Sequence, residues 1–201
     1  MADPSTEIRT GSLRLFVAIE LPGEVREALG RLQHELQRRG LEKLRWVRPE
    51  SIHLTLKFLG ETQAEKVPAI QDALARAAGP GKPDQVTLGG LGMFGNRRSP
   101  RVLWIGVQSV PEVFELYTRI ADELSGQGFP REQRPFSPHL TLARVRPEVA
   151  LEVRPAMVEA IDTVEAPHST IPVREVSLMR STLRPSGAVY ERIAAFALGG
   201  R

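Results

Sequence analysis

A hexapeptide that occurs twice constrains this chain more than any other feature of its sequence. Residues 51–56 read SIHLTL and residues 137–142 read SPHLTL, so five of six positions agree at a spacing of 86 residues. Two of the four histidines of the chain lie in these copies. A repeat at this distance favours two similar halves that each contribute one copy to a shared site.

Each copy alternates in the way expected of a strand with one buried face. In the first copy, His53, Thr55 and Lys57 share the polar face. The opposite face carries the apolar side chains Ile52, Leu54, Leu56 and Phe58. The same alternation places His139 and Thr141 together in the second copy. Each strand therefore presents an imidazole and a hydroxyl group about 7 Å apart along its length.

Paired imidazoles and hydroxyl groups are suited to acid–base chemistry on a small anion. A histidine with a reference pKa of ~6.5 can take up or release a proton near neutral pH. Two histidines can therefore act as base and acid in one cycle, each contributing about 10²–10⁴-fold. Two alternatives remain open at this point. The copies can be plain amphipathic strands, or they can hold a metal, although zinc usually takes three or four ligands and these strands lack carboxylates.

The remaining pattern predicts an α+β fold of two lobes. Polar and apolar residues alternate in most strand-like segments, which favours antiparallel sheets with one helix-covered face. We expect a bilobal architecture with two pseudo-symmetric antiparallel sheets, helices on the outer faces and a central cleft. Residues 1–12 are predicted to be a flexible tail, and residues 13–201 a single two-lobed domain. The expected strands are 14–21, 51–59, 85–88, 101–108, 137–145, 173–183 and 188–196. Helices are expected after Pro22, Thr62 and Pro111, with a short one over 157–161.

Composition narrows the chemistry and the partners. The chain has no cysteine, which excludes disulfides, thiol nucleophiles and thiolate metal sites. Its net charge is +3, but 23 arginines stand against 4 lysines. Arginine binds phosphate through paired hydrogen bonds, so this bias suits a phosphate-rich partner. The absence of a membrane-length apolar run and of a signal-like start predicts a cytoplasmic protein without membrane association.

The two motifs and their flanks resemble a known family, the two-histidine phosphoesterases. Within it, the likeness is specifically to the RNA 2′,3′-cyclic phosphodiesterases, also called 2′-5′ RNA ligases. It is carried by the two His-x-Thr-x motifs and extends over residues 14–196. The matching segments are RLFVAIELP, WVRPESIHLTLKFLGE, RVLWIGV, RPFSPHLTLARV and SLMRSTLRPSGAVYERI.

The resemblance implies that the protein opens RNA 2′,3′-cyclic phosphate ends to 2′-phosphates without a metal or cofactor. It implies His53 as the proton donor and His139 as the proton acceptor. Thr55 and Thr141 would hold the non-bridging phosphate oxygens. The implied partner is RNA with a cyclic phosphate end, tRNA fragments among the candidates, bound by a monomer. Joining of RNA ends through a 2′-5′ linkage is a further implied reaction.

Two alternatives to this function stay open on the sequence. One is a non-catalytic RNA-binding module that uses the same cleft. The other is a phosphodiesterase for another small cyclic phosphate, such as ADP-ribose 1″,2″-cyclic phosphate. Intact histidine and threonine in both copies favour the enzyme, because binding alone would not need paired groups for proton transfer.

Three further residues are candidates for substrate binding. Phe16 shares the polar face of its strand, where an aromatic ring can stack on a base or pack against its neighbours. Lys57 shares the face of His53 and can add positive charge. Arg144 resembles an arginine that follows the second motif in the family. Strict alternation turns Arg144 away from His139, however, so it reaches a phosphate only if the strand bulges.

Other features of the sequence carry less weight. Five loop arginines are expected to be solvated or to line an RNA path, namely Arg97, Arg98, Arg101, Arg131 and Arg134. Residues 90–95 match G-x-G-x-x-G, but a strand rather than a helix is expected after them, so we reject a dinucleotide site. His34 and His168 are expected at the surface. Trp46 and Trp104 are expected in the core or the cleft wall.

Overall fold

The strands form one continuous antiparallel sheet of nine strands in the order β7-β4-β5-β6-β3-β1-β8-β9, with β2 paired to β6. This computed structural model describes residues 11–108, 111–184 and 187–199. One half of the sheet contains β1 (Ser12–Glu20), β3 (His53–Gln63), β8 (Glu175–Arg184) and β9 (Gly187–Ala197). The other half contains β2 (Arg45–Trp46), β4 (Asp84–Asn96), β5 (Ser99–Gln108), β6 (His139–Arg144) and β7 (Thr170–Val173).

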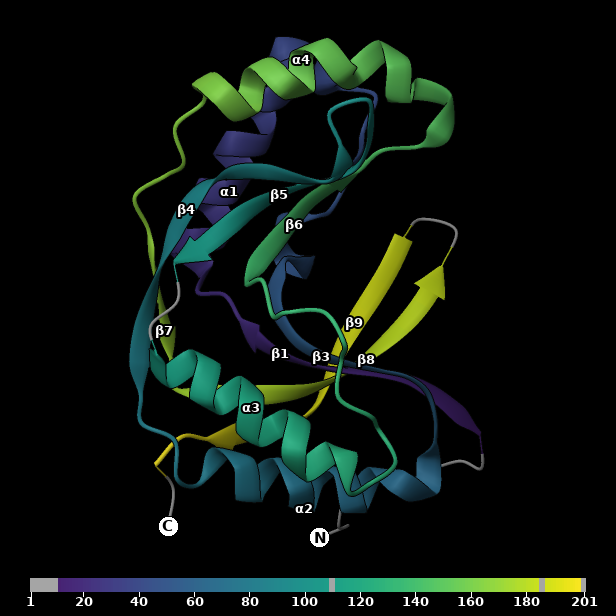
Figure 1. The fold of residues 1–201 in the computed structure, drawn as a ribbon, viewed down its shortest axis with the longest axis vertical. Helices are drawn as coiled ribbons and strands as arrows, with labels where there is room; N and C mark the ends of the chain where they lie inside the picture. The colour runs from purple at the N-terminus through teal and green to yellow at the C-terminus, as the bar shows by residue number, and fades with distance from the viewer. Residues whose placement is uncertain (1–10, 109–110, 185–186, 200–201) are drawn as a thin grey trace, which may run out of the picture.

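Helices cover one face of each half (Figure 1). They are α1 (Gly23–Leu36), α2 (Val67–Ala78), α3 (Pro111–Ser125) and α4 (Ala150–Thr163). Figure 1 shows α1 and α4 against the half with β4, β5 and β6, and α2 with α3 against the half with β1 and β3. Short helical turns lie over Gln37–Leu41, Pro49–Ser51, Ala64–Lys66 and Pro147–Val149.

The expected α+β architecture of two similar halves is confirmed, but the two expected sheets are joined. The connection is the antiparallel pairing of β3 with β6, in which Leu54 is the partner of Leu140. Both leucines are fully buried. The two copies of the repeated hexapeptide are therefore the strands that meet at the centre of the sheet.

Helices α1 and α3 each pack on the half of the sheet that does not contain the strand before them in the sequence. α1 follows β1 yet packs on the other half, where the Gln33 amide on α1 donates to the carbonyl oxygen of Leu142 in β6. α3 follows β5 yet contacts β3. Each half of the sheet is therefore covered by one helix from each half of the sequence.

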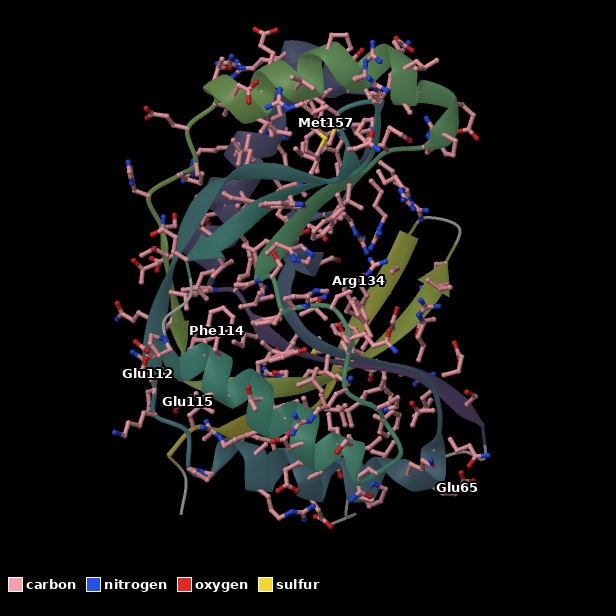
Figure 2. The ribbon with its side chains drawn as sticks, viewed as in Figure 1. Glu65, Glu112, Phe114, Glu115, Arg134 and Met157 are labelled. Atoms are coloured by element: carbon pink, nitrogen blue, oxygen red, sulfur yellow. The ribbon has the colours of Figure 1, made fainter. Side chains whose placement is uncertain are left out.

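The main core lies between the sheet and these helices. The apolar residues of α1 and α3 at helical spacing are buried there, as are the alternating residues of the strands. Met157 points from α4 towards the sheet (Figure 2), and it is fully buried. A smaller cluster lies on the opposite face of the sheet and consists of Phe16, Ala18 and Met179, with Tyr190 packed against it.

The glycine-rich segment is part of a strand, whereas the strand expected over 85–88 was predicted to end before it. β4 continues through residues 89–95, in which 91–95 pair with β5 after an irregularity at Gly89 and Gly90. Gly92 is needed because the Trp104 ring lies over its backbone, where a Cβ would come within 2.2 Å of the ring. Residues 90–95 lie within a strand, where the dinucleotide fingerprint would need the start of a helix.

Two segment boundaries differ from the expected ones. The short helix predicted over 157–161 extends over the whole of α4, which was obscured because Pro155 lies inside it. Of the predicted tail, residues 1–10 lie outside the described residues, but Ser12 already begins β1. The predicted C-terminal hairpin is present as β8 and β9, and its turn residues Pro185 and Ser186 lie outside the described residues. Among the described helices, no helix combines the length and apolar character of a membrane span.

Candidate active site

A β-bulge in the first motif strand decides which side chains face the site. In the pairing of β1 with β3, Ala18 is the partner of Thr55, but Val17 is the partner of Lys57, so Leu56 is an extra residue. Partners in an antiparallel pair point to the same face of the sheet. Thr55 therefore shares the face of Ala18, away from the main core, whereas Lys57 shares the core face of Val17.

The second motif strand, β6, has a bulge at the equivalent position of the second copy. In the pairing of β5 with β6, Trp104 is the partner of Thr141, but Leu103 is the partner of Ala143, so Leu142 is the extra residue. The next pair is Val102 with Arg144. The bulge thus returns Arg144 to the face of Thr141, which strict alternation would not have allowed.

The bulges correct two predictions and remove the obstacle to a third. Lys57 does not share the face of His53. Its side chain is buried, and Nζ donates to the carbonyl oxygen of Pro130. Phe58, predicted to be buried, takes the equivalent place on the open face and has 65% of its surface exposed. Arg144 is exposed on the same face as His139 and Thr141.

The register brings both motifs to one place on this face. Leu54 and Leu140 are partners and point into the core. Their neighbours His53, Thr55, His139 and Thr141 must therefore point to the opposite face. Because the two strands are antiparallel, the residue before Leu54 lies beside the residue after Leu140, so His53 is beside Thr141. In the same way, Thr55 is beside His139. The two histidines occupy diagonal positions, which in a regular ladder are about 7–8 Å apart.

Both imidazole rings are held by the same local hydrogen bond. His53 Nδ1 lies 2.9 Å from the carbonyl oxygen of Ser51, and His139 Nδ1 lies 2.7 Å from that of Ser137. A carbonyl oxygen only accepts, so Nδ1 carries the hydrogen in each ring. This arrangement leaves Nε2 of each histidine as the nitrogen that can exchange a proton with a ligand.

Aromatic side chains pack against each histidine. The Phe16 ring stacks on His53 with centroids 4.7 Å apart, and Tyr190 meets His53 edge-on at 5.0 Å. Phe94 meets His139 edge-on at 4.6 Å. Phe16 is only 3% exposed, so its ring supports the imidazole of His53. Of the two roles that the sequence left open for Phe16, packing against its neighbours fits this burial, and stacking on a base does not.

The surroundings of His53 favour its neutral form. Burial lowers the pKa of His53 to about 4, although the Ser51 carbonyl and the Glu20 carboxylate each act to raise it. Glu20 is the strand partner of His53, whereas the corresponding partner of His139 is Gly106. The two halves are therefore alike in backbone but differ in charge beside the histidine.

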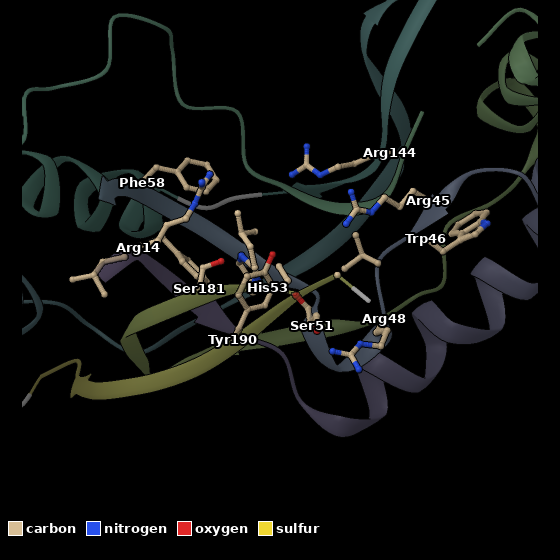
Figure 3. Close-up of a pocket in the computed structure, with 17 residues that line it drawn as sticks. Arg14, Arg45, Trp46, Arg48, Ser51, His53, Phe58, Arg144, Ser181 and Tyr190 are labelled. Carbon is tan, nitrogen blue, oxygen red and sulfur yellow. Dashed lines mark hydrogen bonds between the residues drawn. The ribbon is translucent and has the colours of Figure 1, made fainter. Parts of the chain in front are cut away.

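A cavity of about 490 Å³ opens beside His53 (Figure 3). Its size falls in the range of small-molecule sites. Four arginines line it, namely Arg14, Arg45, Arg48 and Arg144. Phe16, Phe58 and Tyr190 are among the other lining residues. Phe58, Tyr190 and the cluster of arginines other than Arg144 were not singled out in the sequence, because no short motif marks them.

The loop arginines predicted along an RNA path do not line this cavity. Arg97 forms a bidentate ion pair with Asp162, and Arg131 pairs with Asp122. Arg98, Arg101 and Arg134 are exposed. His34 and His168 are exposed, as expected. Within the described residues, no three histidine, aspartate or glutamate side chains form a cluster that could hold a metal ion.

A family model described as LigT like phosphoesterase matches the chain twice in succession, over residues 19–104 and 105–190. The two matches are offset by the same distance as the repeated hexapeptide.

Curated relatives are similar over almost the whole chain. A protein of Archaeoglobus fulgidus named RNA 2′,3′-cyclic phosphodiesterase is 35% identical over 92% of this chain and 99% of its own length. One of the same name from Thermotoga maritima is 33% identical over 89% of this chain and 92% of its own length.

Solved structures show the same fold. A crystal structure of a Thermus thermophilus protein has a TM-score of 0.76 at 31% identity and covers 94% of this chain and 99% of its own. Escherichia coli LigT in complex with 3′-AMP has a TM-score of 0.72 at 30% identity and covers 93% of this chain and 98% of its own.

Proposed function

Because this chain belongs to the LigT-like phosphoesterase family, we propose that it hydrolyses RNA 2′,3′-cyclic phosphate ends to 2′-phosphates with its two motif histidines as acid and base. The observation that carries the proposal is the pair of imidazoles on one face of the sheet, each with Nδ1 tied to a carbonyl and Nε2 left for proton exchange. The names of the relatives and the 3′-AMP bound to E. coli LigT support an RNA-derived substrate.

The proton bookkeeping of the reaction needs both histidines. His139 takes a proton from the attacking water as its oxygen bonds to phosphorus. The bond from phosphorus to O3′ breaks, and His53 gives a proton to O3′. The product keeps its phosphate on O2′. When a 5′-hydroxyl group of a second RNA replaces the water, the same steps join the two ends through a 2′-5′ linkage.

The two motif threonines serve the charge on the cyclic phosphate. Thr55 and Thr141 lie next to the histidines on the same face, where their hydroxyl groups donate to the non-bridging oxygens. Such preorganised donors are worth most where negative charge builds up in the transition state.

The low pKa of His53 in the free protein fits a donor that is charged by its substrate. An anionic phosphate next to the ring favours the imidazolium form and raises the pKa. His53 thereby acquires its proton in the complex, where it is needed for the leaving oxygen. With one histidine neutral and one charged, the dependence of turnover on pH should be bell-shaped.

The test is incubation with an oligonucleotide that ends in a 2′,3′-cyclic phosphate, followed by chromatography of the product. We expect a 2′-phosphate, retained activity in EDTA, and loss of activity by several orders of magnitude in His53→Ala and in His139→Ala. His34→Ala is the matched control, because His34 is exposed on α1. A 3′-phosphate product, or loss of activity in EDTA, would contradict the proposal. Tight binding of the oligonucleotide without hydrolysis would favour the non-catalytic RNA-binding alternative. Faster turnover of ADP-ribose 1″,2″-cyclic phosphate than of the oligonucleotide would favour a phosphodiesterase for another small cyclic phosphate.

A further inference from the structure

Two arginines face each other directly across a pair of strands at the cavity. In the antiparallel pairing of β2 with β6, Arg45 is the partner of Arg144. Partners point to the same face, and like charges directly opposite each other destabilise a sheet. A fold that keeps this pair bears an electrostatic cost that an anion between the two side chains would remove.

The two guanidinium groups are left open to such an anion. Both side chains are exposed, both line the cavity, and both extend towards the same space (Figure 3). The salt bridges among the described residues pair neither of them with a carboxylate. Arg97, by contrast, is neutralised by Asp162.

The strand that carries Arg45 is anchored on both sides although it has only two residues. The amide of Val47 donates to the carbonyl oxygen of Leu142 at 2.9 Å, next to the bulge that aims Arg144. Trp46 Nε1 donates to the carbonyl oxygen of Leu41 at 3.1 Å. Gln33 Nε2 donates to the carbonyl oxygen of Val47 at 2.7 Å. The backbone positions of both arginines are thus fixed before any ligand binds.

We propose that Arg45 and Arg144 form a second phosphate subsite, which binds the phosphodiester on the 5′ side of the terminal nucleotide. This inference rests on the proposed function, which puts the cyclic phosphate at the histidines. The cavity of about 490 Å³ between His53 and the arginine pair then receives the terminal nucleoside. The protein is therefore selective for the end of an RNA chain, or a 5′-phosphorylated nucleotide, over a nucleoside cyclic phosphate without a second phosphate.

The test compares substrates that differ only in the charge of that group. We would measure kcat/KM for a dinucleotide with a 2′,3′-cyclic phosphate, for the same dinucleotide with an uncharged methylphosphonate linkage, and for nucleoside 2′,3′-cyclic phosphates with and without a 5′-phosphate. A charge-assisted hydrogen bond is worth about 1.5–3 kcal/mol, so each charged substrate should exceed its uncharged counterpart by roughly 10–100-fold.

Arg45→Gln should reduce both of these ratios to near one. Arg31→Gln is the matched control and should leave them unchanged, because Arg31 is an exposed arginine on α1 beside Glu27. Equal kcat/KM for charged and uncharged substrates in the wild-type protein would overturn the inference, as would a preference that persists in Arg45→Gln.

Binding of the 2′-phosphorylated dinucleotide and its methylphosphonate analogue separates this inference from the proposed function. If the charged ligand binds more tightly but no cyclic phosphate is hydrolysed, the proposed function fails and the phosphate subsite stands. If all the cyclic phosphates are hydrolysed but neither binding nor turnover responds to the charge, only the inference fails.

Discussion

His53 and His139 have the same local sequence and the same backbone hydrogen bond, but their neighbours differ. Phe16 and Tyr190 enclose His53, and its strand partner is the acidic Glu20. The partner of His139 is Gly106, which carries no charge. Nearly symmetric strands therefore carry histidines in unlike surroundings, which is the condition for two unlike roles in one reaction.

The first prediction concerns the pKa of His53. Burial sets this pKa at about 4 in the free protein, and a bound 2′-phosphate should raise it because the phosphate favours the charged ring. Glu20→Gln should lower the free value further, since it removes a neighbouring negative charge. Histidine side-chain NMR during a pH titration measures both shifts. A free His53 that titrates near 6.5 would contradict the prediction.

The same pKa predicts how stability depends on pH. The unfolded chain binds a proton at His53 near pH 6.5, whereas the folded chain does so only near pH 4. The contribution of the neutral ring is therefore present above pH 6.5 and is lost as the pH falls towards 4. Urea unfolding across this range should show a shallower loss of stability for His53→Gln than for the wild type.

Phe58 is the residue that we expect to contact a base. Its ring is 65% exposed on the cavity wall, and stacking on a base is worth about 1–3 kcal/mol. Phe58→Ala should therefore weaken binding of a 2′-phosphorylated dinucleotide by roughly tenfold or more. Phe114→Ala is the control, because Phe114 is 43% exposed on α3 and packs against Phe136. Equal losses of affinity in both variants would argue against a stacking role.

At the scale of the strand, the sequence predicted the two motif strands and the common face of His53 and Thr55. It could not predict the bulges at Leu56 and Leu142, because a leucine in a bulge looks like any other apolar residue in the alternation. The extra residue Leu56 in β3 reversed the expected directions of Lys57 and Phe58. A bulge was the stated condition for Arg144 to face the site, and the structure meets it.

The bulge in β6 has a support that can be tested. Gln33 on α1 is only 4% exposed, and its amide donates to the carbonyl oxygen of Leu142, the extra residue. Gln33→Leu removes the amide that donates to the carbonyl oxygens of Val47 and Leu142. The free energy of unfolding should therefore fall by about 1–3 kcal/mol. The direction of Arg144 depends on this bulge, so kcat/KM should fall as well.

Chemical denaturation and turnover of the same variant measure the two effects together. Gln63→Leu serves as the control because Gln63 is exposed at the end of β3. A stable Gln33→Leu protein with unchanged kcat/KM would show that the bulge holds itself without the helix.

At the scale of the whole molecule, the two halves of the sequence contribute strands to one continuous sheet and exchange helices across it. The repeat and the alternation indicated two similar halves, and each half matches the family model once. Periodicity carries no information on which sheet a helix packs against, so the exchange of α1 and α3 between the halves could not be predicted. The sequence also did not predict that the two sheets are joined, because a single leucine pair makes the connection and alternation does not show which strands pair.

This exchange predicts that a fragment of residues 1–98 does not fold cooperatively on its own. Its helix α1 buries Val25, Leu29, Leu32 and Leu36, and α1 lies on the half of the sheet that contains β5 and β6 (Figure 1). Exposing four such side chains costs on the order of 10 kcal/mol, which equals the whole stability of a typical domain.

Circular dichroism during thermal unfolding should therefore show no cooperative transition for residues 1–98 or for residues 99–201 alone. Mixing the two fragments should restore a transition, because each then supplies the helix that the other half of the sheet lacks. The restored mixture should also regain turnover if both motifs are required. A cooperative transition in the first fragment alone would mean that α1 can fold back onto its own strands, so that the exchange is a choice of packing and not a requirement of the fold.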